Sequence, residues 1–176
     1  MGMFEKGDYI VYGAAGICEV KEIGKVNIGA ADKNKLYYTL EPLNAKGSAV
    51  YTPIDNTKVI MRRILTVEEA EALIRAIPEI DALWVENDKQ REQIYRETMR
   101  TCDCREWIRI IKTLYLRKQD RIARGKKVTT TDERYLRMVE ENLYTELSIP
   151  LGIEKEKMAD YITEKVTNMS QESTIV

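Results

Sequence analysis

Few residues in this 176-residue chain have the types and spacing that catalysis or metal binding requires. The chain contains no histidine, which excludes Ser-His-Asp and Cys-His catalysis, histidine-liganded zinc and any imidazole proton shuttle. Its three cysteines, Cys18, Cys102 and Cys104, supply neither four zinc ligands nor a disulfide framework. We therefore expect reduced thiols, no catalytic residue, no metal site and no cofactor.

Motifs for nucleotide binding and for acid–base chemistry are missing as well. The chain has neither a Gly-x-x-x-x-Gly-Lys-Ser/Thr loop nor a Gly-x-Gly-x-x-Gly fingerprint. The run Gly13–Gly16 is predicted to be a turn rather than a phosphate cradle. Neighbouring carboxylates such as Glu68 and Glu69 point about 100° apart on a helix, so they are expected to be solvated. The sequence predicts a protein that is not an enzyme and has no evident small-molecule ligand.

Charge is distributed unevenly along the chain, although the total is only −1. The net charge is +2 over residues 1–64, −5 over 65–90, +7 over 91–127 and −5 over 128–176. The +7 stretch has the electrostatic signature of a contact with a polyanion such as nucleic acid. The same pattern is typical of a solvated helix face with intrahelical ion pairs, so charge alone leaves both interpretations open.

The candidate DNA contacts are the basic residues of this stretch and an aromatic residue just before it. The basic candidates are Arg91, Arg105, Arg109, Lys112, Arg117, Arg121, Arg124, Lys126 and Lys127. Trp107 lies in a helical stripe of apolar residues and is predicted to be a core residue. Trp84 fits a core position only loosely: either it is structural, or it is exposed and wedges between bases or stacks on them.

The elements that must position these residues fall into two parts, and the first is rich in β-formers. Residues 1–64 contain five short runs typical of strands: Tyr9–Tyr12, Ile17–Ile23, Leu36–Leu40, Ala49–Thr52 and Lys58–Met61. Glycine, proline and asparagine mark turns between them. This pattern predicts a small antiparallel β-barrel of the SH3 or Tudor type.

Residues 65–167 are predicted to form an all-α domain of about five helices, which makes the chain a two-domain α+β protein. Thr66 and Glu69 have the spacing of a capping box at the start of the first helix. The second helix is expected over Asp81–Arg100.

The third helix has the clearest pattern. Asp103 and Glu106 are predicted to cap its start, and Gly125 its end. Its apolar residues recur with helical spacing: Trp107, Ile110, Ile111 and Leu114. At about 100° per residue the opposite side is basic, with Arg105, Arg109 and Lys112.

The last part of the chain predicts two more helices and a tail. Thr129 or Thr130 is expected to cap the fourth helix, which runs through Leu147 until Pro150 and Gly152 break it. A fifth helix is expected over about residues 154–166, followed by a frayed tail at 168–176. No leader segment and no run of 18 apolar residues is visible, so we expect a soluble, cytoplasmic protein without a membrane partner.

Several motifs occur in an order and spacing that a known family shares. The first part contains Phe4-x-x-Gly7-Asp8-Tyr9-Ile10-Val11-Tyr12-x-x-x-Gly16-Ile17-x-x-Val20, then Tyr37–Leu40 and Val50-Tyr51-x-Pro53. The helical part contains Trp84, Lys89, Leu114-Tyr115-x-Arg117, Thr129–Leu136 and Glu146-Leu147-Ser148. Over about residues 3–166 the chain resembles CarD/CdnL-type bacterial transcription regulators, which share an RNA-polymerase-interacting domain with the transcription–repair coupling factor. The helical part with this tryptophan favours CarD over the coupling factor, in which the barrel accompanies a helicase.

The resemblance implies a regulator of transcription. Its Tudor-like domain would bind the β subunit of RNA polymerase by adding a strand edge, and its helical domain would contact promoter DNA at the upstream edge of the melted bubble. Trp84 corresponds to a tryptophan that wedges into the minor groove, with weak sequence specificity, and stabilises the open complex. Lys89 corresponds to a basic contact nearby.

The chain departs from the best-known members of the family in two ways. Glu86 stands where they carry a second basic residue, and their polymerase-contacting arginines fall near Val26 and Tyr51. The expected polymerase-binding residues are Lys25, Val26, Val50, Tyr51 and Thr52. Such a regulator would be associated with the nucleoid through the polymerase.

A protein–protein interaction module remains the alternative. In that case the barrel binds a strand edge by β-augmentation. The basic face of the helices would then dock an acidic protein, without contact to DNA.

Overall fold

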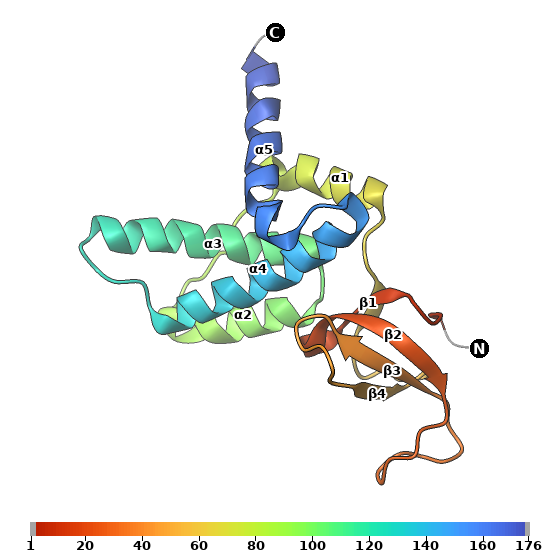
Figure 1. Ribbon diagram of the computed structural model, residues 1–176. Helices are drawn as coiled ribbons and strands as arrows, with labels where there is room; N and C mark the ends of the chain where they lie inside the picture. The colour runs from red at the N-terminus through yellow and green to blue at the C-terminus, as the bar shows by residue number, and fades with distance from the viewer. Residues whose placement is uncertain (1–2, 175–176) are drawn as a thin grey trace. The chain divides into compact units, whose positions relative to one another are not determined.

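The computed structural model describes residues 3–174, which divide between Ile64 and Leu65 into two compact units (Figure 1). The first unit contains an antiparallel sheet of five strands, and the second contains five α-helices. The predicted fold class, a β domain followed by a helical domain, is confirmed. Within residues 3–174 no helix combines the length and the apolar character that a membrane span requires.

The strands of the first unit are hydrogen-bonded in the order β4–β3–β2–β1–β5. Their bounds are β1 Tyr9–Tyr12, β2 Gly16–Gly24, β3 Tyr37–Pro42, β4 Val50–Pro53 and β5 Met61–Arg63. The fifth strand begins at Met61, whereas the sequence predicts it over Lys58–Met61. Met61 pairs with Tyr12, the last residue of β1, so residues before Met61 lie beyond the end of their partner strand.

The connection between β1 and β2 is a tight turn, as predicted for Gly13–Gly16. Residues Gly13–Ala15 form the short 3-10 helix η1, and the backbone of Gly13 has a φ of +41°. A Cβ at Gly13 would lie 2.6 Å from Cγ1 of Val59, which is too close for any side chain. Glycine is therefore required here by space as well as by conformation.

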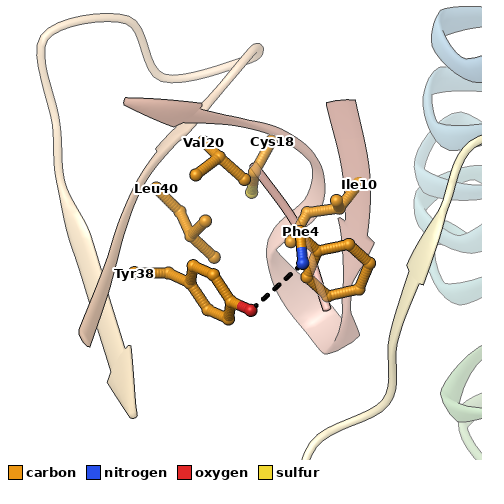
Figure 2. Packing of buried hydrophobic residues seen from close by; sticks show 6 residues of the cluster. All are labelled: Phe4, Ile10, Cys18, Val20, Tyr38 and Leu40. Carbon is orange, nitrogen blue, oxygen red and sulfur yellow. Dashed lines mark hydrogen bonds between the residues drawn. The ribbon is translucent and has the colours of Figure 1, made fainter. Parts of the chain in front are cut away.

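The main buried cluster of the β domain lies on one face of the sheet, to which β2 and β3 contribute alternate residues. Figure 2 shows this cluster, made of Phe4, Ile10, Cys18, Val20, Tyr38 and Leu40. The hydroxyl of Tyr38 accepts a hydrogen bond of 3.2 Å from the backbone N–H of Phe4, and the two rings lie 5.6 Å apart. This contact attaches the segment before β1 to the sheet.

The helices of the second unit pack around α4, which contacts each of the others. Their bounds are α1 Val67–Ala76, α2 Arg91–Arg100, α3 Cys104–Ala123, α4 Thr130–Leu151 and α5 Met158–Thr174. Trp107 of α3 is only 1% exposed, which confirms its predicted place in the core. Glu146 of α4 is fully buried and accepts hydrogen bonds from the backbone N–H of Leu65 and the thiol of Cys104. One carboxylate thus links α4 to the segment just before α1 and to the first residue of α3.

Most of the predicted N-terminal caps are present, except that Glu106 pairs with Arg109 and does not complete the cap of Asp103. Thr66 and Glu69 form a reciprocal capping box at the start of α1. Asp103 accepts a hydrogen bond from the N–H of Arg105, and Thr129 accepts one from the N–H of Asp132. Each of these satisfies a backbone donor that the first helical turn leaves without a partner.

The second helix is shorter than predicted. It starts at Arg91, not at Asp81; before it come an irregular segment, residues 80–87, and the short 3-10 helix η3, Asp88–Gln90. The side chain of Asn87 accepts a hydrogen bond from the N–H of Lys89 and so caps η3. Backbone groups upstream of Asn87 bond to side chains of α3, and these tertiary partners replace intrahelical hydrogen bonds.

Two predicted helix ends are also wrong. Helix α4 continues through Pro150 and stops at Gly152, whose φ is +64°. Helix α5 reaches Thr174, so the predicted frayed tail from residue 168 is helical up to that residue, while 175–176 lie outside the described residues. Since the sequence after Gly152 contains neither glycine nor proline, nothing in it interrupts α5.

Candidate functional site

Trp84 has a side chain that projects into solvent. It is 85% exposed, more than any other large hydrophobic residue in the described part of the chain. It lies in the irregular segment between η2 (Ile77–Glu79) and η3. The interpretation of Trp84 as a structural core residue is therefore wrong. An exposed indole on a non-helical segment is available to stack on a base or to enter a groove.

The segment before Trp84 is attached to one face of α3. The hydroxyl of Thr113 accepts a hydrogen bond of 2.8 Å from the backbone N–H of Leu83. Two basic residues donate to backbone carbonyls of the same segment, Arg109 to that of Asp81 and Lys112 to those of Ile77 and Ile80. Since irregular backbone has no ladder partners of its own, these side chains satisfy groups that would otherwise need water.

The sequence predicts that Arg109 and Lys112 lie on a free basic face, and this prediction is wrong. Both are half-buried, and Arg109 also pairs with Glu106 across 3.2 Å. Among the residues predicted for that face, only Arg105 is exposed.

The segment after Trp84 is held by a network of ion pairs. Asp88 pairs with Arg91 at 2.9 Å and with Arg117 at 3.3 Å. Arg117 in turn donates to the buried Asp132 of α4 at 2.6 Å. The hydrogen bond from Arg91, followed by the charges of Arg91 and Arg117, lowers the pKa of the Asp88 carboxyl. Arg91, the first residue of α2, thus pairs locally with the segment, and Arg117 binds the segment to α3 and α4. Both residues were predicted as DNA contacts.

Some of the remaining candidate cations bond to other groups of the protein, and the others are exposed without an ion pair. Arg121 donates to the backbone carbonyl of Lys127 at 2.7 Å, and Arg124 pairs with Asp120 on the helix surface at 3.2 Å. Four predicted residues are exposed and form no ion pair within residues 3–174: Lys89, Arg105, Lys126 and Lys127. Lys118 shares these properties; it belongs to the +7 stretch, and that charge is the only signal that marks it in the sequence.

These cations are not equally close to Trp84. Thr113 attaches Leu83 near the middle of α3, and Arg105 lies about 12 Å from Thr113 along the helix axis. Lys126 and Lys127 follow the end of α3 at Ala123, about 15 Å from Thr113 in the other direction. The structure therefore brings Arg91, Arg109, Lys112 and Arg117 to the Trp84 segment as supports. Lys89, in the adjoining η3, is the exposed cation nearest to Trp84 in the chain.

The residues predicted to bind polymerase include part of β4, which is an edge strand. The N–H of Ile54 donates to the carbonyl of Leu36 at 3.1 Å, and hydrogen-bonded pairs alternate along antiparallel strands. Val50 and Thr52 therefore bond to β3, while the N–H and C=O of Tyr51 point to the outer edge. The ring of Tyr51 is exposed, so both its backbone and its side chain are accessible.

The other predicted polymerase contacts differ from Tyr51. Thr52 is 1% exposed, and its hydroxyl accepts a hydrogen bond from Asn56, which makes its side chain structural. Lys25 is exposed and Val26 half-buried, in the long connection that follows β2. Gly24 pairs with Tyr37, which pairs with Pro53, so this connection leaves the sheet at the Pro53 end of β4.

Neither metal nor thiol chemistry has a candidate site in the part of the chain that the structure describes. No group of three or more cysteine or carboxylate side chains there could hold a metal ion. All three cysteines are buried, and the thiol of Cys104 donates to Glu146.

Comparison with known proteins identifies the β domain. Residues 4–65 match the family model of the CarD-like/TRCF RID domain. A search of curated proteins returns no match to the chain. The match coincides with the part of the sequence in which the five strands form.

Proposed function

Because residues 4–65 are a CarD-like RNA-polymerase-interacting domain, we propose that this protein is a transcription regulator that binds the β subunit of RNA polymerase and stabilises the promoter open complex. The β domain anchors it to the polymerase in the cytoplasm. The helical domain contacts DNA at the upstream edge of the bubble. The observation that carries the second step is the 85% exposure of Trp84 on a segment that contacts α3 through Leu83 before it and Asp88 after it.

The outer edge of β4 supports the anchoring step. Its Tyr51 presents one N–H donor and one C=O acceptor to which a strand of the polymerase can pair, as in other cases of β-augmentation. Pro53 has no N–H, so it ends the donor row of this edge. The pairing is therefore short, and side chains around Tyr51 and Lys25 must supply the rest of the affinity.

The exposure of Trp84 supports the DNA step. Inserting an apolar wedge between base pairs costs a few kcal/mol of unstacking. At the edge of a bubble the polymerase has already strained that step, so the indole stabilises an opened state instead of creating it. Lys89, exposed in the adjoining η3, can contact phosphate without reading sequence.

Tethering explains how a chain with a net charge of −1 acts on DNA. Acidic stretches with a net charge of −5 lie on both sides of the basic stretch in the sequence, so its affinity for free DNA is expected to be weak. Binding to polymerase raises its concentration next to the promoter, which makes a weak contact effective.

The experiment is a measurement of open-complex lifetime with polymerase, a promoter fragment and the full chain. Trp84→Ala should abolish the gain in lifetime while leaving polymerase binding unchanged. Because the side chain is exposed, this substitution should also change the free energy of unfolding by less than about 0.5 kcal/mol. An unchanged lifetime would overturn the wedge. If salt-sensitive retention of a forked promoter were also missing, the helices would instead serve a protein partner.

A further inference from the structure

The exposed indole of Trp84 raises a question of how it is held. A side chain that inserts between base pairs binds more tightly when it is already rigid, since ordering a mobile side chain on binding costs free energy. Trp84 has almost no packing around its own ring. Its direction must therefore be determined by the backbone on either side of it.

We infer that Thr113 and Lys112 of α3 are positioning residues for Trp84, and that Lys112 acts through the backbone of residues 77–83 rather than through phosphate. The inference rests on the proposed function of Trp84. The N–H of Leu83, which bonds to Thr113, belongs to the residue directly before Trp84. Lys112 lies beside Thr113 on α3 and fixes the start of the same segment.

The hydroxyl of Thr113 is itself oriented. It donates to the carbonyl of Arg109 at 2.7 Å, and this leaves a lone pair for the N–H of Leu83. Thr113 is 7% exposed, so water cannot easily replace this acceptor. Losing it would leave the Leu83 N–H without its protein partner at the position where the chain turns toward Trp84.

The ammonium group of Lys112 is placed where a helix end attracts positive charge. It donates to the carbonyls of Ile77 and Ile80, at and just after the end of α1 and η2. Carbonyls at the C-terminal end of a helix carry partial negative charge, which favours a cation there. The ammonium group of Lys112 thus donates to backbone carbonyls within the protein, and this directs it away from a DNA phosphate.

Both ends of the segment are thus tied to the same helix. Thr113 and Lys112 hold the side before Trp84, and Arg117 holds Asp88 on the side after it. Between Leu83 and Asp88 the chain is short, and Trp84 lies next to the first of these anchors. Helix α3 therefore acts as the rigid support of the indole.

The first test needs no DNA. In the full chain, NMR relaxation of the Trp84 indole N–H and hydrogen exchange of the Leu83 amide are compared in Thr113→Val and Thr113→Ser. Valine removes the acceptor, and serine keeps it in a smaller side chain. Valine should speed exchange at Leu83 about fivefold and increase the motion of the Trp84 indole. Serine should preserve both, and the buried Trp107 indole should be unaffected. Equal behaviour of the two variants would overturn the inference.

The second test separates positioning from phosphate contact. Removal of a phosphate-binding lysine lowers the slope of log affinity against log salt by about one unit. On the polymerase–promoter complex, Lys89→Met should reduce this slope, whereas Lys112→Met should shorten open-complex lifetime at an unchanged slope. A reduced slope for Lys112→Met would overturn its positioning role. If Lys112→Met does not fold, Thr113→Val and Thr113→Ser still test whether support from α3 matters for the open complex. Thr113→Val should shorten the open-complex lifetime about fivefold, and Thr113→Ser should keep it near that of the unmodified chain.

The two tests also distinguish this inference from the proposed function. If valine at 113 mobilises the indole but Trp84→Ala leaves open-complex lifetime unchanged, the wedge fails while the geometric support remains. If valine leaves the indole rigid, the inference fails even where Trp84→Ala shortens the lifetime.

Discussion

Nε of Arg117 in α3 lies 2.6 Å from Oδ2 of Asp132 in the first turn of α4. Their side chains are 20% and 5% exposed, so the pair is largely removed from water. Arg117 also reaches Asp88, which makes it the link between α4 and the segment that carries Trp84. An arginine from the most basic stretch of the chain thus serves to assemble the helical domain.

Removal of Asp132 should therefore destabilise the protein. Asp132→Ala leaves Arg117 partly buried without its strongest partner, and we expect a loss of about 3 kcal/mol in the free energy of unfolding. Urea denaturation of the full chain measures this. Glu133→Ala is the matched control, because Glu133 is an exposed carboxylate in the same helical turn. Equal losses in the two variants would show that the pair contributes nothing beyond the ordinary effect of a carboxylate near a helix N-terminus.

The outer edge of β4 leads to a second prediction. Tyr51→Pro removes an N–H that points away from β3, so the sheet should remain intact while affinity for polymerase falls by about fivefold. Affinity is measured by titration against the isolated β subunit. Tyr51→Ala keeps the N–H and reports on the ring alone. Should Tyr51→Pro bind as tightly as the unmodified chain, polymerase does not pair with this edge.

Thr52→Pro serves as the contrasting variant. Its N–H belongs to the ladder with β3, so this substitution should lower the thermal stability of the β domain as well as binding. A Tyr51→Pro variant that melts as early as Thr52→Pro would contradict the assigned direction of the Tyr51 N–H.

The third prediction concerns alkaline pH. Burial raises the pKa of the Cys18 thiol from 9.0 to about 11. Below pH 9 the thiol is protonated in folded and unfolded chains alike, and its contribution to stability is constant. Between about pH 9 and 11 the unfolded chain loses this proton and the folded chain keeps it, so stability falls as pH rises.

Urea midpoints at pH 8 and pH 10.5 test this dependence. The unmodified chain should lose more stability between the two pH values than Cys18→Ala, since other titrating groups are common to both. The native thiol should also react slowly with a thiol reagent at pH 8, because Cys18 is fully buried. An identical pH dependence in the two proteins would disprove the effect of burial.

Features that depend on neighbours in the chain are predictable from the sequence. The capping box of Thr66 and Glu69 and the core position of Trp107 follow from spacing alone, because a helix brings residues three and four apart together. The same holds for the β-rich runs that form strands and for the two-part fold class. The motif around Tyr9–Tyr12 was sufficient for a family resemblance that the match to residues 4–65 confirms.

The roles of the basic residues and of Trp84 were decided by tertiary structure. In the sequence, Arg109, Lys112 and Arg117 look like basic residues exposed on a helix. Their hydrogen-bond partners, however, come from segments 15 to 35 residues away in the chain. Helix α2 starts late for the same reason, since α3 supplies hydrogen bonds that a longer α2 would have made internally. Periodicity reports which side of a helix a residue occupies. What covers that side depends on long-range packing, and in this chain packing turned several expected DNA contacts into the support of one exposed indole.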